Sequence, residues 1–278
     1  MSMRRTVIFW IALIVVAAAT ALLAWHGPRR DRATGTGEAP PMTAAVRPDI
    51  CSETTFEGAR AILCVVDPAD HATRLVYRGE SGKPHGRVRS AVAALAAEGR
   101  TPVLAMNAGM YHADMTPVGL YVEDGVELSP LNTGGGFGNF YLKPNGVFFL
   151  RADGSAGVME TEAYREAGIA PAFATQSGPM LVIGGEIHPR ILPDGTTRYI
   201  RNGVGVRADG KLVFAITRDP VSFGAFARLF RDVAQCPDAL FFDGSVSSLA
   251  WGTDMEIDPG EPAGPIVAVF EKPSSPES

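Results

Sequence analysis

One acidic side chain stands between an apolar segment and a run of small hydroxyl residues. Residues 239–248 read ALFFDGSVSS, which places Asp243 where a predicted strand ends. The glycine that follows leaves the backbone beside Asp243 open to a ligand, and many binding and catalytic sites are built in this way. A carboxylate so held can act as a general acid or base, or as a nucleophile. An ordinary turn is the alternative interpretation of an Asp-Gly pair.

Other polar clusters also combine glycine with the end of an apolar run. Asn107 and Tyr111 belong to the first of them, and Gln176 belongs to a later one. For any single cluster, the spacing of its residues alone does not distinguish a binding or catalytic site from an ordinary turn. The clusters are residues 105–111, 116–121, 138–146, 174–180 and 201–205, the last of which we pair with 242–248.

Short strands are predicted to carry these clusters. They are bounded by Gly, Pro, Asp or Asn, and only two segments have a convincing helical period. The predicted helices are Arg87–Glu98 and Ser222–Ala234. We therefore expect an α+β fold, in which a single domain holds a large mixed or antiparallel sheet and few helices. The predicted strands are Ala61–Val66, Arg74–Tyr77, Val103–Met106, Gly119–Glu123, Gly146–Arg151, Gly157–Thr161, Ala239–Asp243 and Pro265–Phe270, with a hairpin over Val204–Thr217.

The length and composition suit one large globular domain or two small ones, and the charge excludes some partners. The chain has 278 residues, 46% of them apolar, together with 31 glycines and 21 prolines. Its formal net charge is −5, and the stretch after residue 32 is more acidic still, because five arginines precede that point. Nucleic acid binding needs clustered Lys and Arg, so we expect no nucleic acid partner.

The N-terminal segment is predicted to export the chain. Arg4 and Arg5 precede twenty uncharged residues, 6–25, which are long enough to span a bilayer. The small residues at 19–21 suit a cleaved signal peptide, whereas the length of the run and its final tryptophan favour a retained membrane anchor. We therefore expect an inner-membrane-anchored, periplasmic or secreted protein. The expected organisation is a signal or anchor at 1–25, a flexible linker at 26–48, the domain at 49–272 and a disordered tail at 273–278.

Two of the three cysteines have the spacing of a disulfide. Cys51 and Cys64 flank a predicted turn, and an exported protein would meet an oxidising compartment. Two buried free thiols are the alternative. Cys236 follows the second predicted helix, and we expect it to be a buried apolar residue rather than a nucleophile.

Taken together and in order, the polar clusters resemble the motif series of the phosphodiester glycosidase family. The resemblance covers roughly residues 50–271 and is strongest to the bacterial branch described as exopolysaccharide-biosynthesis-like. The mammalian branch, which includes N-acetylglucosamine-1-phosphodiester α-N-acetylglucosaminidase, has a more glycine-rich Asp-Gly-Gly-Gly-Ser-Ser where this chain has DGSVSS. The segments are AMNAGMY, PVGLY, GNFYLKPNGVF, ATQSGPML, RNGVGV, FGAFARLFRD and ALFFDGSVSSL.

The resemblance implies hydrolysis of a glycosyl-1-phosphodiester, and roles can be given to residues of the clusters. Asp243 would act at the anomeric carbon, Arg201 would grip the phosphate with its guanidinium fork, and Asn107 would hydrogen-bond the substrate. For a second catalytic carboxylate, Asp114 and Glu123 are the candidates. The implied substrate-binding residues are Tyr111, Gln176, Ser177, Asn202, Ser245 and Ser248.

Metal binding has little support in the sequence. The five histidines show no zinc spacing, and His112, beside Tyr111, is expected at the rim of the pocket. We predict no cofactor, although a divalent cation could bridge Asp243 and a phosphate. The rival to a hydrolase is a non-catalytic cell-envelope module that binds glycan-phosphate through the same pocket.

Overall fold

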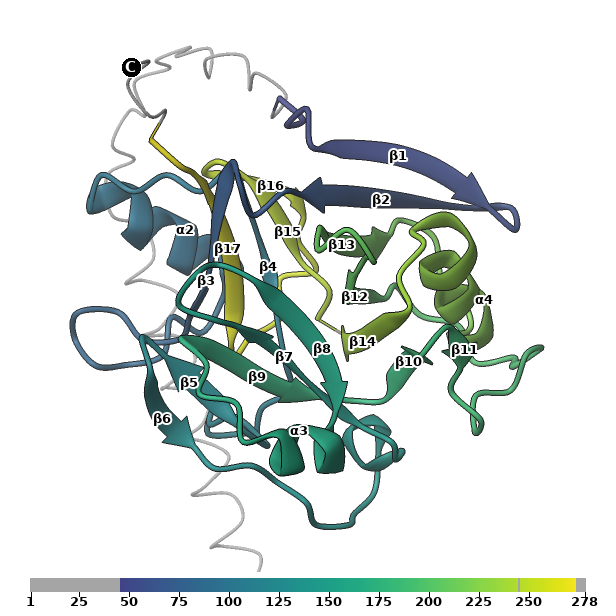
Figure 1. Cartoon of the computed structure of the whole chain (residues 1–278). Coiled ribbons are helices and arrows are strands. Elements are labelled where there is room, and N and C mark those ends of the chain that lie inside the picture. Colours follow the sequence, from purple (N-terminus) through teal and green to yellow (C-terminus); the bar gives the residue numbers. More distant parts are fainter. Residues whose placement is uncertain (1–45, 245, 274–278) are drawn as a thin grey trace, which may run out of the picture. The chain divides into compact units, whose positions relative to one another are not determined.

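The computed structural model describes residues 46–244 and 246–273, and its strands form three sheets (Figure 1). Within these residues, no helix is long and apolar enough to cross a membrane. The predicted signal or anchor at 1–25 lies outside the described residues, as do most of the predicted linker and all but the first residue of the predicted tail.

The largest sheet has seven strands, and every neighbouring pair in it is antiparallel. In spatial order its strands are β1 (Cys51–Phe56), β2 (Ala59–Val66), β13 (Leu212–Thr217), β12 (Asn202–Val206), β14 (Asp238–Asp243), β10 (Met180–Ile183) and β11 (Glu186–Ile187).

Two five-stranded sheets, also antiparallel throughout, complete the fold. The first contains β16 (Asp254–Ile257), β15 (Leu249–Trp251), β4 (Leu104–Asn107), β17 (Ile266–Glu271) and β3 (His71–Val76). The second contains β6 (Val126–Ser129), β5 (Tyr121–Glu123), β9 (Phe173–Ser177), β7 (Gly146–Leu150) and β8 (Ala156–Glu160).

Strand alternation divides the core into a central part and outer parts. Along β14, the side chains of Leu240 and Phe242 enter a central core to which all three sheets contribute. Ala239 and Phe241 point the other way and pack with helix α4 (Phe223–Arg228), which lies beside this sheet in Figure 1. The central core therefore fixes the strand ends at which the polar clusters lie.

The remaining helical elements are short. Helix α2 (Val88–Ala97) packs its apolar side against the sheet that contains β4. Helix α3 (Thr161–Ala167) follows β8, a 3₁₀ turn η1 (Asn139–Tyr141) precedes β7, and a π-helical turn η2 (Leu229–Val233) continues α4.

The structure confirms the predicted strands and helices in outline and adds elements that we did not predict. Every predicted strand overlaps an observed one, but the strands divide into three sheets instead of one large sheet. Helix α3 replaces the end of the predicted strand 157–161, because the Glu160 carboxylate caps it by accepting the N–H groups of Glu162 and Ala163 at 2.8 and 3.0 Å. The strands that were not predicted are β1, β6, β9, β10, β11, β15 and β16.

The predicted disulfide is confirmed. Cys51 and Cys64 lie directly opposite each other in the β1–β2 pairing and are bonded, which closes the first hairpin covalently. Cys236 is a buried free thiol, and burial raises its pKa to about 12. A thiol held protonated in this way is a packing residue, as expected.

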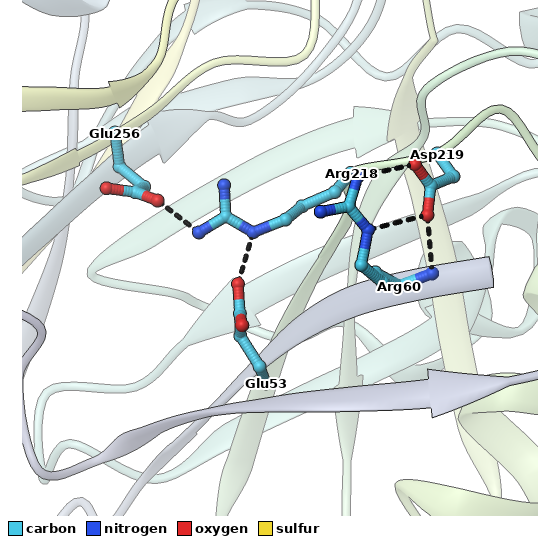
Figure 2. A network of polar contacts seen from close by, with 5 residues as sticks. All are labelled: Glu53, Arg60, Arg218, Asp219 and Glu256. Atoms are coloured by element: carbon cyan, nitrogen blue, oxygen red, sulfur yellow. Dashed lines mark hydrogen bonds and ion pairs between the residues drawn. The ribbon is translucent and has the colours of Figure 1, made fainter.

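Ion pairs tie the β1–β2 hairpin to its surroundings (Figure 2). The Arg218 guanidinium, just after β13, contacts both Glu53 of β1 and Glu256 of β16, so it links two sheets. Arg60 of β2 donates from Nη2 to Asp219 Oδ1 at 2.8 Å and from its backbone N–H to Asp219 Oδ2 at 2.9 Å. The hairpin is thus held by charge contacts along its length as well as by the disulfide.

Candidate functional site

A groove of about 480 Å³ opens at the end of β14 and has Asp243 in its wall. Three parts of the chain form it: the segment that follows β4, the segment around η1, and the turn after β14. The lining residues are Met110, Tyr111, His112, Ala113, Val118, Phe137, Gly138, Asn139, Phe140, Tyr141, Asp243 and Val246.

Sheet pairing fixes the backbone of Asp243. The residue lies opposite Asn202 in the β12–β14 pairing, next to a register shift. Its backbone N–H donates to Asn202 Oδ1 at 3.2 Å, and its Oδ1 accepts the Gly244 N–H at 2.6 Å. The carboxylate is therefore oriented by the turn itself, at the edge of the groove and only half-buried.

Two buried asparagines form the floor beneath this turn. Asn202 Nδ2 donates to Asn107 Oδ1 at 3.0 Å and to its backbone carbonyl at 2.8 Å, while Asn107 Nδ2 donates to Asn202 Oδ1 at 3.4 Å. Asn202 Oδ1 also accepts the Ser247 hydroxyl at 3.3 Å, and Asn107 Oδ1 accepts the Ser248 N–H at 2.9 Å. Both amides are consumed by the protein, so this geometry gives them a positioning role rather than direct substrate contact.

Tyr111 forms the wall beside Asp243. Its hydroxyl donates to the Pro262 carbonyl at 2.6 Å, and its ring lies so close to Gly264 that an added Cβ there would stand 2.7 Å from Tyr111 Cβ. Burial, together with the nearby carboxylates of Asp243 and Glu261, raises the Tyr111 pKa to about 12. The phenol therefore stays protonated at neutral pH and can only donate or accept hydrogen bonds.

Gln176 and Ser177 are buried supports rather than groove residues. Gln176 Oε1 accepts the N–H groups of Leu120 and Asn132 at 3.0 and 2.9 Å. Its Nε2 donates to the Asn132 carbonyl at 2.8 Å and to Thr161 Oγ1 at 3.1 Å, so all its hydrogen-bonding capacity is directed inward. Ser177 Oγ donates to the Phe242 carbonyl at 3.0 Å.

Of the two serines expected to bind substrate after Asp243, one is described. Ser248 is 3% exposed and its hydroxyl donates to the Val246 carbonyl at 2.9 Å, so it closes the turn from inside. Ser245 lies outside the described residues.

The structure does not bring Arg201 to the groove. Asn202 lies opposite Ile216, whose side chain is in the central core, and Arg201, one residue earlier, faces the α4 side. Its guanidinium stacks 3.7 Å from the Phe223 ring centroid, and its Nε donates to the Val221 carbonyl at 2.9 Å. Burial lowers its pKa to about 10. The predicted phosphate-binding role of Arg201 therefore has no geometric support here.

The candidates for a second carboxylate also lie off the groove lining. The Glu123 carboxylate accepts the Tyr121 hydroxyl at 2.9 Å, and burial raises its pKa. Asp114 caps its own loop by accepting the hydroxyl of Thr116 at 2.6 Å, a bond that lowers the Asp114 pKa. Among the described lining residues, Asp243 is the sole carboxylate. No cluster of three or more potential metal ligands occurs in the described part of the chain.

Comparison with known proteins places the chain in a family. The model of the phosphodiester glycosidase family matches residues 100–269. The uncharacterized protein YigE of Escherichia coli (strain K12) is 33% identical over 184 residues, which cover 66% of this chain and 71% of YigE. The chain belongs to the phosphodiester glycosidase family.

Solved structures show the same fold at low sequence identity. The catalytic domain of zebrafish N-acetylglucosamine-1-phosphodiester α-N-acetylglucosaminidase, auto-inhibited by its pro-peptide, matches with a TM-score of 0.58 and 14% identity over 80% of this chain and 82% of that one. A Burkholderia pseudomallei K96243 protein described as exported matches with a TM-score of 0.52 and 12% identity over 76% of this chain and 74% of that one.

Some features in and around the groove were missed in the sequence. Glu261 contributes to the raised pKa of Tyr111, and it belongs to a segment in which we found no motif. Phe137 lines the groove from a glycine-rich stretch that resembles a simple loop. The sequence shows Phe137 between two glycines, but nothing in the sequence indicates that its ring is fully exposed. The expectation that His112 lies at the pocket agrees with its place in the lining.

Proposed function

We propose that the chain hydrolyses a glycosyl-1-phosphodiester bond in a cell-envelope or exopolysaccharide substrate. The observation that carries the proposal is the carboxylate of Asp243 in the wall of the groove, in a chain of the phosphodiester glycosidase family. The net reaction adds water across the bond between the anomeric carbon and the phosphate oxygen. Its products are a free sugar and a phosphate monoester.

Asp243 is proposed to act at the anomeric carbon, as a nucleophile or as the base that activates water. The phosphate monoester is a good leaving group, so one carboxylate and a polar wall can be sufficient. Asn107 and Asn202 take part by fixing the Asp243 turn from below. Tyr111 donates its hydroxyl hydrogen to the Pro262 carbonyl, so beside that carboxylate its oxygen can accept a hydrogen bond from the substrate.

Phosphate recognition is proposed to fall to His112 in place of Arg201. Among the described lining residues, His112 is the one whose side chain can carry a positive charge. The chain is acidic overall and the groove also holds Asp243, so its charge gives little attraction for an anion, and we propose that the substrate is bound mainly through its sugar.

The uncharged segment 6–25 supports a location in the cell envelope, where a glycan-phosphate polymer would be found. This location and the polymer are parts of the proposal.

The test is hydrolysis by the full chain in detergent. UDP-N-acetylglucosamine and methyl N-acetylglucosaminyl phosphate are incubated with it in ¹⁸O-labelled water, with and without EDTA. We expect release of free sugar that carries the label at its anomeric oxygen. Label in the phosphate would contradict glycosidic cleavage, and binding without turnover would favour a glycan-phosphate-binding module. The EDTA arm reports whether a divalent cation takes part.

A further inference from the structure

A glycine-rich arm, residues 132–138, carries an aromatic side chain to the edge of the groove. The arm reads NTGGGFG, and its one large side chain, Phe137, is 101% exposed although it belongs to the groove lining. Full exposure leaves the ring without packing partners in the protein. At the edge of a groove, such a side chain supplies apolar surface that a bound ligand can cover.

The arm is anchored at its base. The Gln176 side chain bonds both the N–H and the carbonyl of Asn132, at 2.9 and 2.8 Å. Asn132 Nδ2 in turn donates to the Val118 carbonyl at 2.9 Å, and Lys143 Nζ donates to the Thr133 carbonyl at 2.6 Å. The start of the arm is therefore fixed by buried and half-buried groups, whatever the freedom of its tip.

The tip is also positioned. Gly136 lies against the Tyr141 ring so closely that an added Cβ would stand 2.6 Å from two ring carbons, and Gly138 has a φ of 91° that favours glycine. Any larger residue at Gly136 would push the arm off Tyr141. The two glycines set the path of the chain on either side of Phe137.

Aromatic and polar residues share the groove. Phe137, Phe140 and Tyr141 contribute aromatic surface, while Asp243 and His112 contribute polar groups. A pyranose ring has the matching character, because one face presents C–H groups to an aromatic ring while its hydroxyls reach polar partners. Inorganic phosphate and dimethyl phosphate, which carry no sugar, offer no such apolar face.

We propose that Phe137 is a stacking platform for the sugar ring of the substrate, and so a determinant of specificity for the glycosyl group. The identity of this ligand rests on the proposed function, in which Asp243 acts at the anomeric carbon of that sugar. Because Phe137 contributes no packing to the folded chain, its removal alters ligand binding and leaves stability unchanged.

The test is calorimetric binding to the full chain carrying Asp243→Asn, so that the ligand survives. The probes are methyl N-acetylglucosaminyl phosphate and dimethyl phosphate. Phe137→Ala is expected to raise the Kd of the sugar diester by about tenfold, near the low end of the effect of removing an aromatic ring that stacks on a nucleobase. Phe137→Tyr should restore binding. The control Leu192→Ala changes a largely exposed apolar residue off the groove and should bind as the parent does. Melting temperatures of all variants should agree.

Several outcomes overturn the stacking role. They are sugar-diester binding by Phe137→Ala within twofold of the parent, a parent that does not bind the sugar diester, and an equal loss for dimethyl phosphate. Failure of the proposed function gives a different result. If the chain never hydrolyses these diesters but Phe137→Ala still weakens sugar binding, the proposed function is rejected and the stacking role of Phe137 stands.

Discussion

Asn107 and Asn202 lie 95 residues apart in sequence and exchange side-chain hydrogen bonds directly beneath the Asp243 turn. Each belongs to a different sheet, Asn107 at the end of β4 and Asn202 at the start of β12. The pair therefore joins two sheets at the point where the candidate catalytic carboxylate leaves a third strand, β14. The position of Asp243 therefore depends on two asparagines that are fully buried and do not line the groove.

Asn202→Ala is expected to destabilise the fold and misplace Asp243 together. The change leaves the Asp243 N–H and Asn107 Nδ2 without their shared acceptor, whereas the Ser247 hydroxyl keeps its bond to the Asp243 carbonyl at 3.0 Å. Each buried group left unsatisfied costs about 1–3 kcal/mol in the free energy of unfolding. Urea titration measures the loss, with the exposed Asn139→Ala as control. An Asn202→Ala chain as stable as the parent would show that the pair is not a structural support.

Asp243→Asn is expected to lower turnover at least about a hundredfold, the low end for acid–base catalysis, while the melting temperature stays near that of the parent. The amide keeps the shape of the side chain and removes its charge and proton-accepting ability. Rates on a sugar-1-phosphodiester that the parent cleaves give the measurement. Asp254→Asn, an exposed acid on β16, serves as the control and should retain full activity. Near-normal hydrolysis by Asp243→Asn would reject its catalytic role.

The sequence predicted the positions of the polar clusters better than the directions of their side chains. Apolar runs that end in polar residues and glycine located Asn107, Asn202 and Asp243, and long-range pairing brought them together. Adjacent residues of a strand point to opposite faces, so Arg201 and Asn202 could not both face one ligand. Which of the two side chains faces the central core depends on how this segment pairs with β13. That pairing is not a local property of the sequence.

The same limit explains the elements that were missed. Strand β9 reads FATQS, a polar pattern that suits a loop, yet all five residues are buried because Gln176 and Ser177 bond other segments. Partners more than forty residues away satisfy those polar groups, and no local pattern reveals them. The division into three sheets is likewise a property of pairing and not of strand count.

Arg201→Lys is expected to reduce stability more than activity. A lysine cannot stack a planar cation on the Phe223 ring or hold the Val221 and Thr197 carbonyls in the same geometry. No carboxylate of the described residues forms an ion pair with Arg201, so packing and carbonyl contacts hold it. We expect a loss of about 1–3 kcal/mol in the free energy of unfolding, and a KM within about threefold of the parent. A large rise in KM at unchanged stability would instead place the guanidinium at the phosphate.

Asp219→Asn is expected to lower stability in a pH-dependent way. Hydrogen bonds from the Arg60 side chain and backbone N–H lower the Asp219 pKa from 3.8 to about 2 (Figure 2). Because the folded-state pKa is the lower one, the stabilisation is fully present above the ordinary pKa and disappears as the pH falls through about 2. The melting temperature of the parent should therefore exceed that of Asp219→Asn at pH 7, by less at pH 3, and not at all below pH 2. Since the pair is exposed, added salt should reduce the difference in melting temperature at pH 7.

Melting curves of the parent and Asp219→Asn across this pH range make the measurement, with Asp254→Asn as the control acid. A gap that stays constant down to pH 2 would show that the asparagine perturbs the hairpin by some means other than the lost charge.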